Sequence, residues 1–226
     1  MSRRLLHIVL VLLLFTSCGH RSQEMSEALL RAEEMNRNYQ SMDTLKGMEQ
    51  VADYYRPFLG RSQRYMCALY MLGCVYRDRG DAPMALHYYQ EAVSQADTTD
   101  ADCDFHTLCR IYGQMSVLYQ RQRSPRLELE AERKAYGAAM RAKDTIAAIS
   151  YYECMAGAYY ALGKKDSALA IVENSISQYA KMKERRLAAA EMGFAADFHI
   201  KKKDFKRADS LPLIPQHYNL TLFISS

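Results

Sequence analysis

Three residues of one segment have the types and spacing of metal ligands. Cys103, His106 and Cys109 recur at every third position, so on a helix they would project from neighbouring parts of one face. Thiolates and imidazoles are the ligands that zinc prefers, and Cys154 could supply a distant fourth. The spacing differs from the C-x2-C pairs of structural zinc sites. We therefore favour packing for these side chains, and predict no metal and no other cofactor.

The common sequence patterns of catalytic sites are missing from the sequence. It contains no Gly-rich phosphate loop, no H-E-x-x-H and no nucleophile elbow. No plausible acid–base pair stands out either. We therefore predict a protein that is not an enzyme and has no catalytic residues.

Cys18 is the residue with the clearest chemistry. Arg3 and Arg4 precede an apolar run over residues 5–15, which is too short to span a membrane and typical of a signal peptide. The following Leu14-Phe15-Thr16-Ser17-Cys18 resembles a bacterial lipobox, with Phe15 where Leu is usual. The resemblance implies that residues 1–17 are removed, that Cys18 is lipidated and that residues 18–22 form a short tether. The alternative is an ordinary signal peptide followed by an unrelated cysteine.

The location of the chain follows from this anchor. The residues after Cys18 are not acidic, whereas some surface-displayed lipoproteins carry an acidic stretch there. We expect a lipid-anchored protein of the bacterial cell envelope that faces the periplasm, with inner or outer membrane left open.

The composition indicates a folded, helical protein. Of 226 residues 49% are hydrophobic and 25% charged, and only 5 Pro and 10 Gly interrupt the chain. The net charge of +4 is too small and too dispersed to indicate nucleic-acid binding. Apart from Cys18, the cysteines are odd in number and stand at helical positions, so we expect buried thiols rather than a disulfide framework.

The segment Met66–Asp97 holds two amphipathic runs joined at Gly80-Asp81. The positions with helical spacing are, in the first run, Leu69, Leu72, Gly73 and Tyr76, and in the second, Ala85, Tyr89 and Ala92. The small residues allow two helices to approach closely, and the large ones fill the space between them. This pattern resembles the tetratricopeptide repeat (TPR), with Leu69 at its Trp position and Asp97 in place of its closing Pro.

Similar helix pairs recur along the chain at intervals of about forty residues, longer than the ~34 of the standard repeat. An earlier, degenerate pair covers Ser26–Met35 and Leu45–Tyr55. Later pairs place small residues at Ser116, Ala156 and Ala196. The helix expected over Leu127–Ala142 has many alanines, but the sequence does not decide which of its residues occupy the repeat positions. In the later pair, the expected N-cap of the second helix is Asp166 or Ser167.

These repeats predict an all-α fold, a right-handed superhelical solenoid of about four to five TPR-like helix pairs over residues 23–211. The last pair is incomplete, because Pro212 and Pro215 end its second helix. Residues 212–226 form an irregular tail. It either covers the end of the solenoid or derives from truncation of a longer parent protein.

The TPR resemblance implies where a partner would bind, since the family uses the concave face lined by the first helix of each pair. Carried over position by position, the groove residues are Tyr70, Arg77, Arg110, Gln120, Glu153, Tyr160, Asp197 and Lys201. Cys67 and Cys74 would face the same groove. This mixed lining suits a polar peptide more than an apolar helix. We expect a protein or peptide partner, and no small-molecule ligand.

The whole layout resembles the TPR lipoproteins of Bacteroides-type bacteria. It implies a non-enzymatic scaffold tethered to the membrane, or the sensing arm of a shortened signalling protein. The alternative is a glycan-binding accessory lipoprotein of an outer-membrane uptake system (SusD-like), although such proteins are longer and use Trp, which is absent here.

Short Asp-Ser/Thr motifs recur in the chain, beginning at Asp43, Asp97, Asp144, Asp166 and Asp209. They resemble the O-glycosylation sequon of Bacteroides-type exported proteins. The same residues are also preferred as helix N-caps, so both interpretations stay open.

Overall fold

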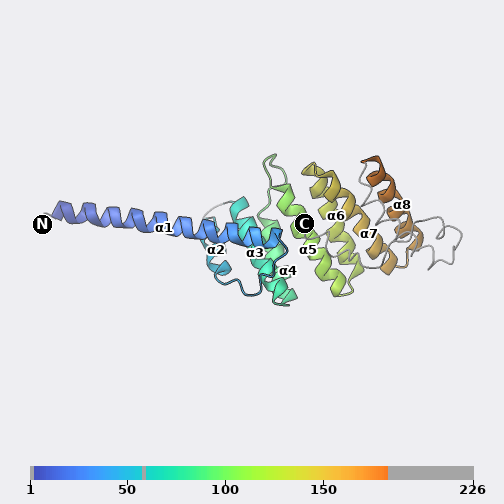
Figure 1. Cartoon of the computed structure of the whole chain (residues 1–226), viewed down its shortest axis with the longest axis horizontal. Helices are drawn as coiled ribbons and strands as arrows, with labels where there is room; N and C mark the ends of the chain where they lie inside the picture. Colours follow the sequence, from blue (N-terminus) through green and yellow to red (C-terminus); the bar gives the residue numbers. More distant parts are fainter. Residues whose placement is uncertain (1–2, 58–59, 183–226) are drawn as a thin grey trace. The chain divides into compact units, whose positions relative to one another are not determined.

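The computed structural model describes residues 3–57 and 60–182, and of residues 3–19 only the backbone. In this part of the chain all regular structure is helical (Figure 1). The helices are α1 (Arg3–Arg37), α2 (Met48–Tyr55), α3 (Gln63–Asp78), α4 (Ala82–Ser94), α5 (Phe105–Arg121), α6 (Pro125–Arg141), α7 (Thr145–Ala161) and α8 (Lys165–Lys181). The expected fourth echo at residues 192–208, the groove residues Asp197 and Lys201 and the tail lie outside the described residues.

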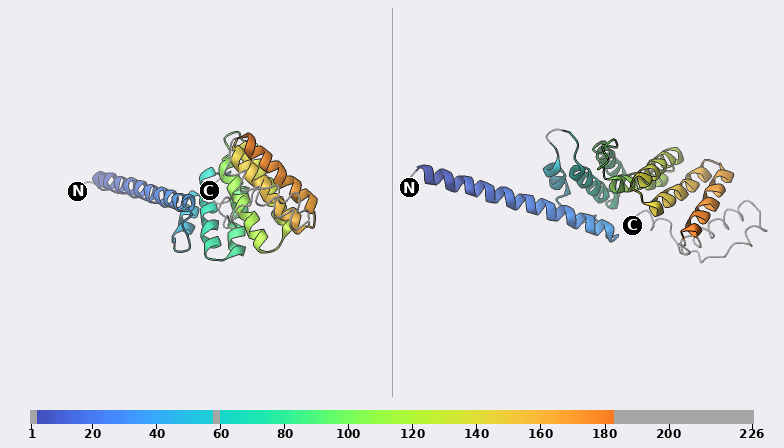
Figure 2. Two further views of the ribbon diagram at one scale, coloured as in Figure 1. Left: turned by 45° about the vertical axis from the view of Figure 1, so that its right-hand side comes forward. Right: turned by 90° about the horizontal axis from the view of Figure 1, so that it is seen from above.

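The helices form two compact units, Met1–Asp97 and Thr98–Ser226. In unit 1, the C-terminal part of α1 packs on α2 and α3, and its N-terminal part extends away from them (Figure 2). Leu29 and Ala32 of α1 are buried, as are Met48 and Val51 of α2. The degenerate first repeat is therefore a real helix pair, although α2 begins at Met48 rather than at Leu45.

The pair α3 and α4 has the packing that its sequence predicts. Tyr89 is fully buried and its ring lies directly on the α3 backbone at Gly73, where a Cβ atom would come within 2.4 Å of Tyr89 Cε1. Ala85 and Ala92 are also fully buried. The prediction that small residues allow the close approach and that Tyr89 fills the remaining space is thus confirmed.

Unit 2 repeats this arrangement with longer helices. Each of α5, α6 and α7 packs on the next helix in the chain. Met155 and Ala156 of α7 form one hydrophobic cluster with Ala168, Ile171 and Val172 of α8. The helix pair expected at this place is confirmed.

The first helices of successive pairs also lie beside each other within each unit. In unit 1, Cys67 Sγ of α3 donates a hydrogen bond of 2.8 Å to Glu33 Oε1 of α1. In unit 2, a Cβ at Gly113 of α5 would lie 2.7 Å from Tyr151 Cε1 of α7. The arrangement that a shared binding face requires is therefore present within each unit.

The turns inside the three helix pairs from α3 to α8 have one geometry. The second residue after α3, α5 and α7 adopts a left-handed conformation, with φ of 80° at Gly80, 54° at Arg123 and 77° at Gly163. The next amide closes the turn, as when Asp81 N donates to Tyr76 O at 2.9 Å. This is the Schellman pattern, in which glycine is the favoured residue. Arg123 occupies the position without that advantage.

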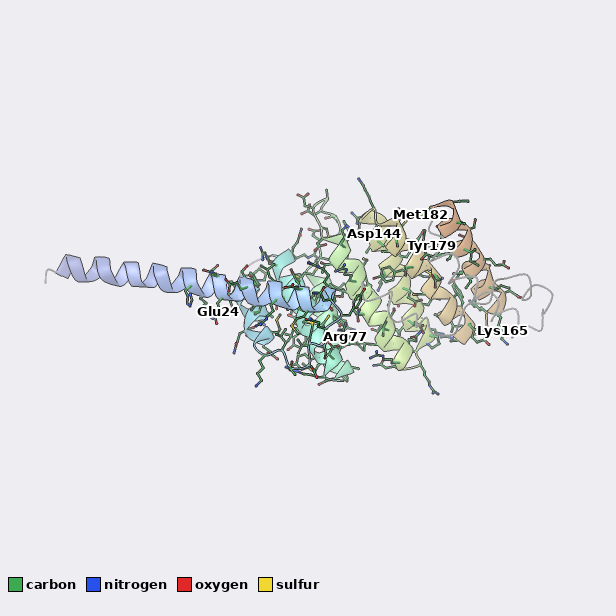
Figure 3. All side chains as sticks on the ribbon, in the orientation of Figure 1. Glu24, Arg77, Asp144, Lys165, Tyr179 and Met182 are labelled. Carbon is green, nitrogen blue, oxygen red and sulfur yellow. The ribbon has the colours of Figure 1, made fainter. Side chains whose placement is uncertain are left out.

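One predicted helix start is wrong. The N-cap of α8 is Lys164, not Asp166 or Ser167, and α8 begins at Lys165 (labelled in Figure 3). The physical reason is the Schellman turn at Gly163, which leads directly into the next helix. Asp166 therefore lies within the first turn, where its negative charge is favourable to the helix dipole.

Two further predictions concern the membrane and the cysteines. Along the described residues, no helix has both the length and the hydropathy needed to cross a membrane. Cys74, Cys103 and Cys109 are buried, and Cys67 and Cys154 are half-buried. Of these, Cys74 is fully buried, so the prediction that it faces the groove is wrong.

Candidate functional site

The positive-φ turns give the register of the three well-described helix pairs. Counted from these turns, Glu128 and Glu132 of α6 occupy the places that Ala85 and Tyr89 occupy in α4. Ala168 and Val172 occupy them in α8. The register of α6, which the sequence left open, is therefore fixed by the turn at Arg123.

These positions are buried in every pair, whatever residue they hold. The exposed fraction is 0% for Tyr89, 2% for Glu132 and 2% for Val172. Glu128 is 4% exposed. Unit 2 thus has two carboxyl groups where the other pairs have apolar side chains, and removing such groups from water is costly unless they are paired.

The two carboxyl groups have few partners. Gln120 Nε2 of α5 donates a hydrogen bond of 3.2 Å to Glu128 Oε1. Glu132 Oε2 is buried and has no hydrogen-bond partner. Burial, followed by repulsion from Glu128, raises the pKa of Glu132 from 4.5 to about 9. Burial also raises the pKa of Glu128, while its bond from Gln120 acts in the opposite direction. We call Glu128 and Glu132 the buried acidic pair.

The acidic pair lies close to the surface at Gly157 of α7. Gly157 is exposed, and a Cβ atom built there would stand 3.9 Å from Glu128 Oε1 and 4.0 Å from Gln120 Nε2. Glu153, one helical turn earlier, is 8% exposed. Residues of α5, α6 and α7 therefore meet at this place.

Tyr70 is a correction to the predicted groove. It is only 3% exposed, its ring centroid lies 5.9 Å from that of Tyr89, and its hydroxyl accepts a hydrogen bond from Asn36 Nδ2 at 3.4 Å. The neighbouring helix α1 covers this position, so Tyr70 is part of the packing of unit 1. It does not offer its ring to a partner.

Arg77 is also committed to the fold. Its Nε lies 2.7 Å from Asp78 Oδ1, and 15% of its side chain is exposed. Asp78 in turn accepts a hydrogen bond of 2.9 Å from Met42 N, which holds the loop after α1 against α3. Arg77 (labelled in Figure 3) therefore has a structural role.

The remaining groove residues of unit 2 differ in exposure. Gln120 is exposed, Arg110 and Tyr160 are half-buried, and Glu153 is buried. The Nζ of Lys165 lies 5.7 Å from the centre of the Tyr160 ring. Three of the four can still contact a partner, whereas the prediction for Glu153 needs correction because α7 packs it inward.

The metal interpretation receives no support from the geometry. Cys109 Sγ donates a hydrogen bond of 3.1 Å to His106 O, and burial raises the pKa of this thiol to about 11, which opposes the thiolate form that zinc requires. His106 is exposed, 3.8 Å from Asp144 Oδ2. Over residues 20–57 and 60–182, no group of three or more candidate ligands could hold a metal ion.

N-capping accounts for one of the Asp-Ser/Thr motifs. Asp144 caps α7 and accepts a hydrogen bond of 3.0 Å from Ala147 N. Asp166 lies inside α8, and Asp43 and Asp97 lie in connections, so capping does not explain them. Asp209 lies outside the described residues. The glycosylation hypothesis remains a prediction.

Comparison with known proteins identifies the fold through structure alone. No family model matches the sequence, and no curated protein matches it. A protein of Podosopora anserina described as a kinesin light chain, with nearly identical TPR-like repeats, is 16% identical, with a TM-score of 0.65 over 83% of this chain and 90% of that one. BtubC from P. vanneervenii is 15% identical, with a TM-score of 0.64 over 85% and 77%.

A third solved structure, aspartyl phosphate phosphatase F from Bacillus subtilis, is 11% identical and has a TM-score of 0.59. The match covers 89% of this chain and 59% of the phosphatase. The fold is therefore an all-α solenoid of TPR-like helix pairs. This confirms the predicted fold class, while identities this low show the fold alone.

Proposed function

We propose that this chain is a non-catalytic scaffold, anchored to a membrane of the cell envelope, which binds a protein or peptide partner on the first helices of its repeats. The observation that carries the proposal is the side-by-side placement of these helices. In unit 2, α5 and α7 present Arg110, Gln120 and Tyr160 with exposed or half-buried side chains. Tyrosine and arginine are common among the residues that dominate binding energies.

The structural neighbours favour the same class. They include a protein described as a kinesin light chain with TPR-like repeats. A stack of helix pairs offers an extended surface rather than an enclosed site, which suits binding of a chain segment.

The acidic pair does not favour an enzyme. A general acid or base must come within hydrogen-bond reach of the reacting group. Glu132 has the raised pKa that such a role needs, but it is 2% exposed and lies on the inward face of α6 at a position that packs against the neighbouring helix in the other pairs.

The binding proposal is tested by crosslinking capture from envelope extract with the whole chain. Replacing Arg110, Gln120 and Tyr160 together by Ala is expected to reduce capture of the specific partner by roughly tenfold or more, because truncating a few central side chains removes most of the binding energy. Tyr70 and Arg77 are left intact, since changing them would disturb unit 1.

The matched control replaces Arg126 and Gln122, which are exposed and lie outside the predicted face, by Ala. Equal capture by both variants would place the binding site elsewhere. Capture of a glycan in place of a protein would instead support the uptake-system alternative.

The anchor is a separate proposal. Residues 3–37 form one helix, so Cys18 would hold the lipid at the start of a rigid segment that leads directly into the first repeat. Acyl chains contribute about 0.8 kcal/mol per buried CH2 group, so two or three of them attach a protein firmly.

We expect Cys18→Ser to abolish incorporation of radiolabelled palmitate and to move the chain out of the membrane fraction. Cys154→Ser, which changes a half-buried cysteine of α7, serves as the control and should leave both unchanged. Unaltered labelling of Cys18→Ser would show that Cys18 is not the anchor.

A further inference from the structure

The buried acidic pair is the feature of unit 2 that packing does not explain. Glu128 and Glu132 are one helical turn apart on α6, so their side chains share a face. That face is turned into the interior, at positions where α4 has Ala85 and Tyr89 and α8 has Ala168 and Val172. A buried, unpartnered carboxylate oxygen such as Glu132 Oε2 is rare in folded proteins and indicates a missing donor.

Within the described residues, Glu128 of the pair lies beside exposed backbone at Gly157. At Gly157 the exposed backbone of α7 has no side chain, and the Glu128 Oε1 atom lies 3.9 Å from the position of the absent Cβ. Gln120, which hydrogen-bonds Glu128, is itself exposed on α5. The carboxyl group of Glu128 thus lies beside the exposed backbone of Gly157, with the amide of the exposed Gln120 next to it.

The chemistry of the site indicates the class of ligand. Two carboxyl groups, together with the buried Glu153 on the next helix, attract a positive charge that brings several hydrogen-bond donors. Among the described residues, no three His, Cys, Asp or Glu side chains are placed so that they could hold a metal ion together. A guanidinium group is planar, has five donors and pairs with carboxylates through two parallel bonds.

We propose that the buried acidic pair, Glu128 and Glu132, binds the guanidinium group of an arginine side chain of the partner, which enters beside Gly157. The inference rests on the proposed binding function and adds the chemistry that the partner must carry. The long, slim arginine side chain reaches past Gly157 and displaces the Gln120 amide from Glu128. Its charge then favours the ionised form of Glu132, which releases its proton to solvent.

The experiment uses the full-length chain, purified in a mild detergent, and a fluorescein-labelled peptide, Gly-Gly-Arg-Gly-Gly. The matched probe has citrulline in place of arginine, which keeps the shape and removes the charge. Fluorescence anisotropy at low ionic strength is expected to show saturable binding of the arginine peptide alone. Equal binding of the two peptides would overturn the proposal, as would saturable binding of Ca²⁺ or Mg²⁺ with none of the arginine peptide.

Two variants with matched controls locate the site. Gly157→Leu places a side chain over Glu128 and leaves both carboxyl groups chemically unchanged. Its control is Gly137→Leu, at an exposed helical glycine of α6 with nothing within 4 Å of its Cβ position. Glu132→Gln removes the deeper charge, and its control is Glu130→Gln on the same helix. We expect each site variant to weaken the affinity for the arginine peptide by roughly tenfold or more, and each control to leave that affinity unchanged.

Far-UV circular dichroism verifies that every variant is folded. If Gly157→Leu and Glu132→Gln bind the arginine peptide as the original chain does, the acidic pair is not its site. That result leaves the scaffold proposal to be decided by the capture experiment, which changes Arg110 and Tyr160 as well as Gln120. The converse result is that the site variants lose peptide binding while the unchanged chain captures no envelope protein. That result would support the arginine site and reject the scaffold proposal.

Discussion

Replacing Glu132 by Leu is expected to stabilise the chain at pH 7 to 9 and to remove most of the pH dependence of its unfolding. Glu132 has a pKa of about 9 in the folded chain, against an ordinary value of 4.5. The folded state therefore retains a proton that the unfolded state loses above pH 4.5. The free energy of unfolding is highest below that pH and falls as the pH rises toward 9.

The size of this effect follows from the shift. Each pKa unit corresponds to about 1.4 kcal/mol, so the difference in stability between acid and alkaline pH is on the order of several kcal/mol. Leu fills the site with an apolar side chain of similar size, as Val172 does in the next pair. Urea unfolding followed by far-UV circular dichroism at pH 5, 7 and 9 measures both effects.

Two companion variants separate the causes. Glu132→Gln removes the titration but keeps a buried polar group, so it should flatten the pH profile and stabilise less than Leu does. Glu130→Gln changes an exposed carboxyl group whose pKa is lowered by its hydrogen bond from Lys134, and should leave the decline above pH 5 intact. If Glu132→Leu loses stability with pH as steeply as the original chain, Glu132 is not the group responsible.

The sequence predicts a helix pair well where its turn contains glycine and its small residues have the TPR spacing. Gly73, Ala85 and Tyr89 satisfy both conditions, and their packing could be derived before the structure was known. The pair α7 and α8, with Gly163 in the turn, was predictable for the same reason.

The register of α6 could not be predicted, because its turn residue is Arg123 rather than glycine. Left-handed backbone at an arginine leaves no signal in the sequence. The alanines of α6 lie on one helical face, but they do not have the spacing of the repeat and therefore do not show where its positions fall. The useful signal was the helix start at Ser124-Pro125. Glu128 and Glu132 follow Ser124 at the same intervals at which the buried Ala85 and Tyr89 follow the N-cap Asp81, so their burial could have been predicted.

The burial of Tyr70 shows a different limit. Its helical position is the one that the repeat assigns to the binding face, whereas its 3% exposure and its contact with Asn36 of α1 show that it is covered. Such a contact depends on how two helices distant in sequence approach each other. Helical periodicity predicts which residues share a face, but not how completely the next helix covers that face.

The packing of α3 on α4 gives the second large prediction, in which Gly73→Leu destabilises unit 1 by about 3 kcal/mol or more. A Cβ at Gly73 would lie 2.4 Å from Tyr89 Cε1 and 2.5 Å from Tyr89 Cδ1. The ring cannot move aside, because Tyr89 is fully buried, its hydroxyl lies 3.5 Å from Cys74 Sγ and Tyr70 packs beside it. Overpacking of this kind forces the two helices apart and exposes the core that they share.

Gly137→Leu is the matched control for this substitution, because it makes the same change at a helical glycine that is exposed and has free space around its Cβ position. There the replacement should be neutral or slightly stabilising, since leucine has the higher helix propensity. Adding Tyr89→Ala to Gly73→Leu should restore part of the lost stability, so that the two changes cost less together than the sum of their separate effects. Strict additivity in urea unfolding, or equal effects at Gly73 and Gly137, would mean that contact with Tyr89 is not why position 73 needs glycine.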